Sequence, residues 1–173
     1  MKKILAIMLA MVFLVSGCST GKKAGLGDEF LGNAHAAVKK AYGENYIPQM
    51  EIEKDFLKDI YGIPMDSVED YIAEGPMMSS HVDNFIGLRV KADSVDKVAT
   101  ALKDYHKVLI ENSIQYPMNV AKVQAAEVLV IEDHVFFLML GAFDDDSETE
   151  EDALKFAKEQ VQIGVNAIKG LVK

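Results

Sequence analysis

Residues 125–143 read Ala-Ala-Glu-Val-Leu-Val-Ile-Glu-Asp-His-Val-Phe-Phe-Leu-Met-Leu-Gly-Ala-Phe. Two apolar runs, Ala125 to Ile131 and Val135 to Phe143, are separated only by Glu132-Asp133-His134. Apolar runs joined by such a short polar break are typical of a β-hairpin. This stretch therefore predicts two adjacent antiparallel strands, with His134 exposed to solvent in the turn.

Regular patterns on either side of the hairpin predict a strand and two long helices. Residues 78–91 alternate as a strand would, with Ile86, Leu88 and Val90 on one face. Residues 95–110 repeat apolar side chains every three or four positions, which favours a helix with one buried face. The last helix is expected from about Ser147 to Leu171, and Ser147 and Glu150 fit a capping box at its start.

The first third of the folded part favours helices. Asp28 can cap a helix that Gly43 closes, and a short helix is expected from Asp55 to Tyr61. Residues 46–52 read as irregular. Asp66 is expected to start another short helix, which the Gly75-Pro76 turn ends.

The order of these elements defines the expected fold class. A β-α-β-β-α core fits an α+β domain with an antiparallel sheet of about three strands and helices over one face. It corresponds to a ferredoxin-like unit that lacks its last strand, preceded by an N-terminal helical segment. Residues 28–173 are expected to form this single domain.

The N-terminus has the pattern of an export signal. Val15-Ser16-Gly17-Cys18 closes an apolar run that opens with Lys2 and Lys3, and it resembles the lipobox of bacterial lipoproteins. The run, from Ile4 to Val15, has about twelve residues, whereas a transmembrane helix needs about twenty. Residues 1–17 are therefore interpreted as a lipoprotein signal peptide that is removed, leaving Cys18 to carry the lipid.

This interpretation has consequences for location and chemistry. Residues 18–27 form a lipidated cysteine and a short tether, so the domain is expected on the extracellular face of the cell membrane. In a cell with two membranes, Ser19 would favour the outer membrane. Cys18 is the only cysteine, so no disulfide, thiolate ligand or cysteine nucleophile is expected in the domain.

The net charge limits the range of partners. The chain carries a formal charge of −9, which becomes −11 when Lys2 and Lys3 leave with the signal peptide. Such an acidic domain repels nucleic acid, and the sequence has no basic aromatic patch. Besides the membrane at Cys18, the expected partner is another envelope protein or a small ligand.

Four residues are candidates for a binding site. His81 and Asp83 would share one face of the predicted strand, where they could form a charged pair, bind a metal with a third ligand, or act as base and orienting group. They could equally be the polar start of a strand. Tyr116 and Asn119 belong to a loop that could line a pocket or simply connect the helix to the sheet.

Other polar residues favour structural roles. No histidine pair has the spacing of a helical metal motif, and no metal or cofactor is expected. The acidic stretch 144–152 fails the calcium-loop pattern, because Thr149 and Lys155 stand where glycine and glutamate are needed. His106 is expected in the core, and His35 is expected to be exposed on the first helix.

Four segments together resemble a known family. They are AYGENYIPQMEI (41–52), YIAEGPMMSSHVDNFIGLRVK (71–91), SIQYPMNVAKVQAAEVLVIEDHVFFLMLG (113–141) and EEDALKFAKEQ (150–160). The combination, together with the lipobox, resembles an uncharacterised family of bacterial lipoproteins, a domain of unknown function common in Gram-positive anaerobes. The resemblance implies a lipid-anchored single domain on the outer face of a single membrane, and it supplies no catalytic residues.

Three functions from different classes remain open. The first is a non-catalytic binding or scaffolding module of the cell surface, which the anchor and the lack of a catalytic motif favour. The alternative is an envelope hydrolase or metal-dependent enzyme centred on His81 and Asp83. A sensor or inhibitor domain that covers a partner through an exposed sheet edge or apolar patch is the third.

Overall fold

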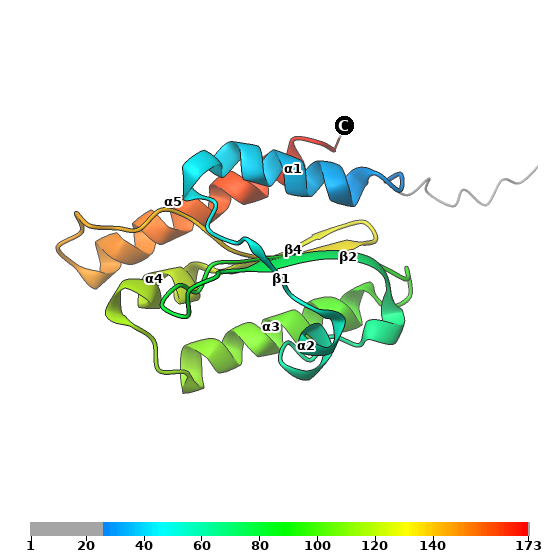
Figure 1. Cartoon of the computed structure of the whole chain (residues 1–173), viewed down its shortest axis with the longest axis horizontal. Coiled ribbons are helices and arrows are strands. Elements are labelled where there is room, and N and C mark those ends of the chain that lie inside the picture. Colours follow the sequence, from blue (N-terminus) through cyan, green and yellow to red (C-terminus); the bar gives the residue numbers. More distant parts are fainter. Residues whose placement is uncertain (1–25, 173) are drawn as a thin grey trace, which may run out of the picture.

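A five-stranded antiparallel sheet runs through the middle of the protein in a computed structural model that describes residues 26–172 (Figure 1). The strand order is β1-β2-β3-β5-β4, so β1 and β4 form the two edges. The strands are β1 (Met50–Glu51), β2 (Val68–Gly75), β3 (Asn84–Val90), β4 (Glu127–Ile131) and β5 (His134–Met139).

Helices cover both faces of this sheet. α1 (Phe30–Tyr42) and α5 (Glu150–Lys169) lie on one face, and α2 (Lys54–Asp59) and α3 (Val95–Asn112) lie on the other (Figure 1). α4 (Pro117–Ala125) lies at one end of the sheet and contacts both α3 and α5. The described residues therefore form an α+β fold, as predicted.

Each face of the sheet has its own hydrophobic core. Phe85 and Phe136 face α1 and α5, whereas Ile86 and Phe137 face the α2–α3 side. Neighbouring residues of one strand point to opposite faces, and each face of the sheet is covered by helices. β5 is therefore buried along its whole length. This double burial explains why residues 135–140 form an unbroken apolar run instead of alternating with polar residues.

The expectation of about three strands with helices over one face understates the sheet. Residues 68–75 were expected to be helical, but they form β2, preceded by a 3-10 turn at Met65–Ser67. β2 pairs with β3 from Val68↔Val90 to Glu74↔Phe85, and this pairing overrides the local helical tendency. β1 was expected to be irregular because a two-residue strand leaves no recognisable alternation.

The hairpin is confirmed, with a shorter turn than predicted. Ile131 pairs with His134, so the connection is Glu132-Asp133, with Glu132 at a φ of 51°. His134 is the first residue of β5 and is fully buried, because the ring of Phe30 packs on it with centroids 4.9 Å apart. The expectation that His134 is solvated is therefore wrong.

Glycine at position 87 brings α1 close to the sheet. A Cβ atom at Gly87 would lie 2.8 Å from Leu31 Cδ1 and 3.1 Å from a ring carbon of Phe136. Neither contact leaves room for a methyl group, because both neighbours are themselves buried. The absence of a side chain therefore sets how near α1 packs against β3.

The residues that end the helices agree with the prediction for α1, whereas the N-terminal cap of α5 is a different residue from the one predicted. Gly43 follows α1 at a φ of 56°, as expected for a glycine that closes a helix. α5 begins at Glu150, and the cap is Thr149 rather than Ser147: its hydroxyl oxygen accepts a bond of 3.1 Å from the Asp152 amide. The acidic stretch before α5 thus leads into the helix start.

The predicted signal peptide, Cys18 and the tether up to residue 25 lie outside the described residues. Leu26 is described, and it packs against the core on the α1 side. Across residues 26–172, none of the helices combines the length and the apolar character that a membrane crossing requires.

Candidate functional site

The four candidate residues lie around the junction between α4 and the segment that joins β2 to β3. β3 begins at Asn84, so His81 and Asp83 precede the strand instead of sharing a face of it. Asp83 is 0% exposed, and Asn119, in the first turn of α4, is 1% exposed. Tyr116, just before α4, is 58% exposed, so its side chain is not enclosed with Asp83 and Asn119.

A lysine that was not among the candidates holds this junction together. The Lys122 ammonium donates hydrogen bonds of 2.8 and 2.9 Å to the two carboxylate oxygens of Asp83. It also lies 4.1 Å from the ring centre of Phe143, where a cation is attracted by the ring. Lys122 is 4% exposed, so one charged pair is enclosed between α4 and the β2–β3 segment.

Asn119, about one helical turn before Lys122, also connects α4 to the β2–β3 segment. Its side-chain amide donates a 2.8 Å hydrogen bond to the Ser80 carbonyl. Asn119 and Lys122 are three positions apart on α4, so both project from one helix face onto the same segment. The segments that follow Gly75-Pro76 and Tyr116-Pro117 therefore meet, and Asn119 and Lys122 make the contact. We call Asp83, Lys122, Asn119, His81 and Phe143 the Lys122 cluster.

The electrostatics of the Lys122 cluster are those of a closed ion pair. Burial raises the pKa of Asp83, and the charge and hydrogen bonds of Lys122 offset this only in part. His81 packs its ring against Phe143 with centroids 5.1 Å apart, and its Nδ1 atom has no hydrogen-bond partner among the described residues. Asn119 Oδ1 likewise has no hydrogen-bond partner among the described residues. Within residues 26–172, no three His, Cys, Asp or Glu side chains group as metal ligands would.

Sequence reasoning missed Lys122 because a lysine on an amphipathic helix is normally expected to be solvated. The available signal was its position three residues after Asn119, within the mostly apolar stretch 120–131. A cation on that apolar helix requires a buried anion, and Asp83 supplies it.

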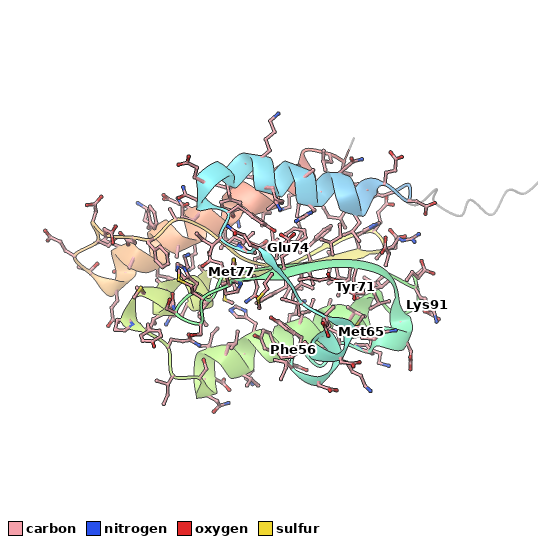
Figure 2. All side chains as sticks on the ribbon, viewed as in Figure 1. Phe56, Met65, Tyr71, Glu74, Met77 and Lys91 are labelled. Carbon is pink, nitrogen blue, oxygen red and sulfur yellow. The ribbon has the colours of Figure 1, made fainter. Side chains whose placement is uncertain are left out.

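A second feature is an open groove between β1 and α2, which we call the β1–α2 groove. Its volume is about 410 Å³, and the wall from α2 carries Phe56 (Figure 2). Gly75, Pro76 and Asn84 close it on the side of β2 and β3. The full lining is Met50, Glu51, Ile52, Glu53, Phe56, Tyr61, Gly75, Pro76 and Asn84.

The β1–α2 groove combines exposed apolar side chains with a fixed polar base. Met50 is 56% exposed and Phe56 is 61% exposed, so both present apolar surface to solvent at the same concavity. At the base, the Tyr61 hydroxyl donates a 3.0 Å bond to Asn84 Oδ1, and Asn84 donates 2.8 Å to the Val82 carbonyl. Hydrogen bonds therefore hold the side chains at the base, while the apolar rim is open to solvent.

A second polar cluster, formed by Glu74, Tyr46, His35 and Lys39 and here called the Glu74 cluster, fixes α1 to the sheet. One carboxylate oxygen of Glu74, on β2, accepts a 2.8 Å bond from the Tyr46 hydroxyl and lies 3.0 Å from His35 Nε2. Lys39 approaches the other oxygen at 3.7 Å. Burial opposes the charge of Glu74, but these partners outweigh burial and hold its pKa below the usual value. His35 is thus partly buried and bonded, and the expectation that it is exposed is wrong.

The remaining histidines have structural environments. His106 is half-buried rather than fully in the core; its Nε2 lies 2.6 Å from the Val123 carbonyl, and its ring packs against Phe137. His134 Nδ1 lies 2.8 Å from an Asp133 carboxylate oxygen. Burial lowers the pKa of His134, so its neutral form is favoured in the fold.

Comparison with known proteins identifies one related family. The sequence profile described as Domain of unknown function (DUF4358) matches residues 41–140. The matched stretch contains all five strands of the described sheet and the whole β1–α2 groove. No significant match was found among curated proteins or among solved structures.

Proposed function

This chain belongs to the DUF4358 family, and we propose that it is a non-catalytic binding module held at the outer face of a cell membrane by a lipid on Cys18. The observation that carries the binding role is the β1–α2 groove. It presents Met50 and Phe56, both more than half exposed, around a concave surface of about 410 Å³. Exposed apolar side chains gathered at a concavity are typical of interaction sites.

The state of Asp83 favours binding over catalysis. A catalytic base needs access to its substrate, but both oxygens of Asp83 bond Lys122 and the residue has no exposed surface. The Lys122 cluster accounts for Asp83 as a structural charge that fixes the β2–β3 segment. The alternative, an envelope hydrolase or metal-dependent enzyme centred on His81 and Asp83, therefore has less support.

The location rests on the lipobox. A lipid on Cys18 would attach the chain without any membrane-spanning helix, since each buried methylene contributes about 0.8 kcal/mol of membrane affinity. The nine residues from Ser19 to Gly27 can span at most about 30 Å. The β1–α2 groove would therefore work close to the surface of the membrane, on its extracellular face, or at the outer membrane of a cell that has two.

Fractionation of producing cells tests the anchor. The unaltered protein should stay with membranes after a wash in high salt and should leave them only in detergent. A Cys18→Ala variant should appear in the soluble fraction or the medium, because the thiol that accepts the lipid is gone. Equal membrane retention of the two proteins would contradict a lipid anchor.

Affinity capture from envelope extracts tests the binding role. The unaltered protein should retain a discrete partner, and Phe56→Ala should lose it. Val130→Ala is the matched control, because Val130 is 42% exposed on β4, at the opposite edge of the sheet. Capture that Phe56→Ala leaves intact would contradict a role for the β1–α2 groove.

A further inference from the structure

We infer that the β1–α2 groove binds an extended segment of a partner protein in which an apolar side chain stands next to a lysine or arginine. The inference rests on the binding role proposed above and specifies the chemistry of the partner.

The size and chemistry of the groove suit a short peptide segment. At about 410 Å³, it lies near the lower end of the range of about 300 to 1,000 Å³ seen for binding pockets. Phe56 offers a flat apolar surface, and Met50 offers a flexible thioether that adapts to side chains of different shapes. An apolar side chain of the partner would cover both and remove their surface from water.

The charge of the lining selects a cation. Glu51 and Glu53 are exposed, and apart from the buried hydroxyl of Tyr61 they are the ionisable groups of the groove. Neither carboxylate forms an ion pair with another described residue. The net charge of −9 adds a field of the same sign. A lysine or arginine would satisfy these carboxylates, whereas an acidic segment would be repelled.

The position of the groove at the sheet edge favours an extended segment. β1 is an edge strand, and within residues 26–172 its only strand partner is β2. An extended segment placed along β1 can use the backbone groups that the edge leaves free, as in peptide recognition by strand addition. β1 has only two residues, so the apolar and ionic contacts of the groove would have to supply most of the affinity.

A pair of designed peptides tests this chemistry on the full-length protein. The probe is a fluorescein-labelled, end-capped peptide of sequence GKVLVKG, and the control is GEVLVEG, in which both lysines become glutamates. Fluorescence polarisation at low salt should show at least ten-fold tighter binding of GKVLVKG. The difference should shrink as salt is raised, because the carboxylates are exposed and therefore screened.

Inverting the charge of the lining tests whether Glu51 and Glu53 cause the preference for the cationic peptide. The double variant Glu51→Lys with Glu53→Lys should reverse the preference, so that GEVLVEG binds the tighter of the two. Asp145→Lys with Glu148→Lys is the control: it makes the same change in net charge on the exposed loop before α5 and should leave the preference unchanged.

Two results would overturn the inference. In one, the unaltered protein binds both peptides equally or binds neither. In the other, both double variants change the preference to the same extent, which would show that only the overall charge matters. If a partner is still captured in a Phe56-dependent manner under either result, the binding role stands and the cationic partner is excluded.

Discussion

Lys122 is the single residue on which the contact between α4 and the β2–β3 segment most depends. Its ammonium neutralises Asp83 in a place that water does not reach. Burying two charges costs free energy even when they pair, so the pair fixes the arrangement of the segments more than it adds stability. Removing one partner, in contrast, leaves a lone buried charge.

Replacement of Lys122 therefore predicts a large loss of stability. Lys122→Met should lower the free energy of unfolding by about 3 to 5 kcal/mol, because Asp83 is left buried without a counter-charge. Denaturant unfolding followed by circular dichroism measures this. The double variant Lys122→Met with Asp83→Leu should be more stable than Lys122→Met alone.

Lys103→Met is the control for this experiment. Lys103 is exposed on α3, so its replacement should change the unfolding free energy by no more than about 0.5 kcal/mol. If Lys122→Met were as mild as Lys103→Met, the description of the Lys122 cluster as a closed ion pair would be wrong.

Glu74 predicts a distinct dependence of stability on pH. Its pKa is lowered in the fold, so its contribution is fully present above the pKa of the unfolded chain, about 4.5, and is lost as the pH falls through the lower folded value. Glu74→Gln should unfold more easily at pH 7 than the unaltered protein does. Below about pH 4.5 the two unfolding free energies should converge. If the difference between the two unfolding free energies stayed constant as the pH fell, the result would contradict the ionised state of Glu74.

At the scale of elements, the packing of α1 on the sheet depends on Gly87. Gly87→Ala should lower the free energy of unfolding by about 1 to 3 kcal/mol, because its methyl group would press on Leu31 and Phe136. Thermal unfolding measures the loss. Gly32→Ala is the matched control: a Cβ there meets nothing within 4 Å, and alanine should stabilise α1 by about 0.5 to 1 kcal/mol. Equal effects of the two variants would show that α1 does not pack tightly on β3.

How well each element could be predicted depended on how strongly tertiary contacts override its local pattern. The hairpin of β4 and β5 is evident in the sequence because burial on both faces leaves a long apolar run. β2 was missed because Glu69, Asp70 and Glu74 interrupt its alternation, and its pairing with β3 is not a local signal. The layer of helices on each face was missed because periodicity shows that a face is buried, not which surface buries it.

The candidate site was predicted in part for the same reason. His81, Asp83 and Asn119 do lie at one junction, but Asp83 bonds Lys122, which was not predicted, and Asn119 bonds the Ser80 carbonyl. Tyr116 was grouped with them because it is near Asn119 in sequence, yet it is exposed at the start of α4. The β1–α2 groove was not predicted, because its walls come from β1, α2 and the end of β2, which meet only in the fold.

At the scale of the whole molecule, the two parts of the proposed function lie in different regions of the chain. In the proposal, the lipobox at the N-terminus would provide attachment, and the folded part would provide recognition. Within the folded part, the Lys122 cluster and the Glu74 cluster tie segments of the β1–β3 region to α4 and α1. The β1–α2 groove is thus carried by a firmly held part of the fold, which suits a site that must keep its shape until a partner arrives.

Site-specific photo-crosslinking in producing cells tests the binding role most directly. A photoreactive phenylalanine analogue at position 56 would sit in the β1–α2 groove, and the same analogue at position 130 would sit on the opposite edge of the sheet. Illumination should give a discrete membrane-associated adduct from position 56 and none of that size from position 130. No adduct from position 56, or the same adducts from both positions, would contradict a binding module that works through this groove.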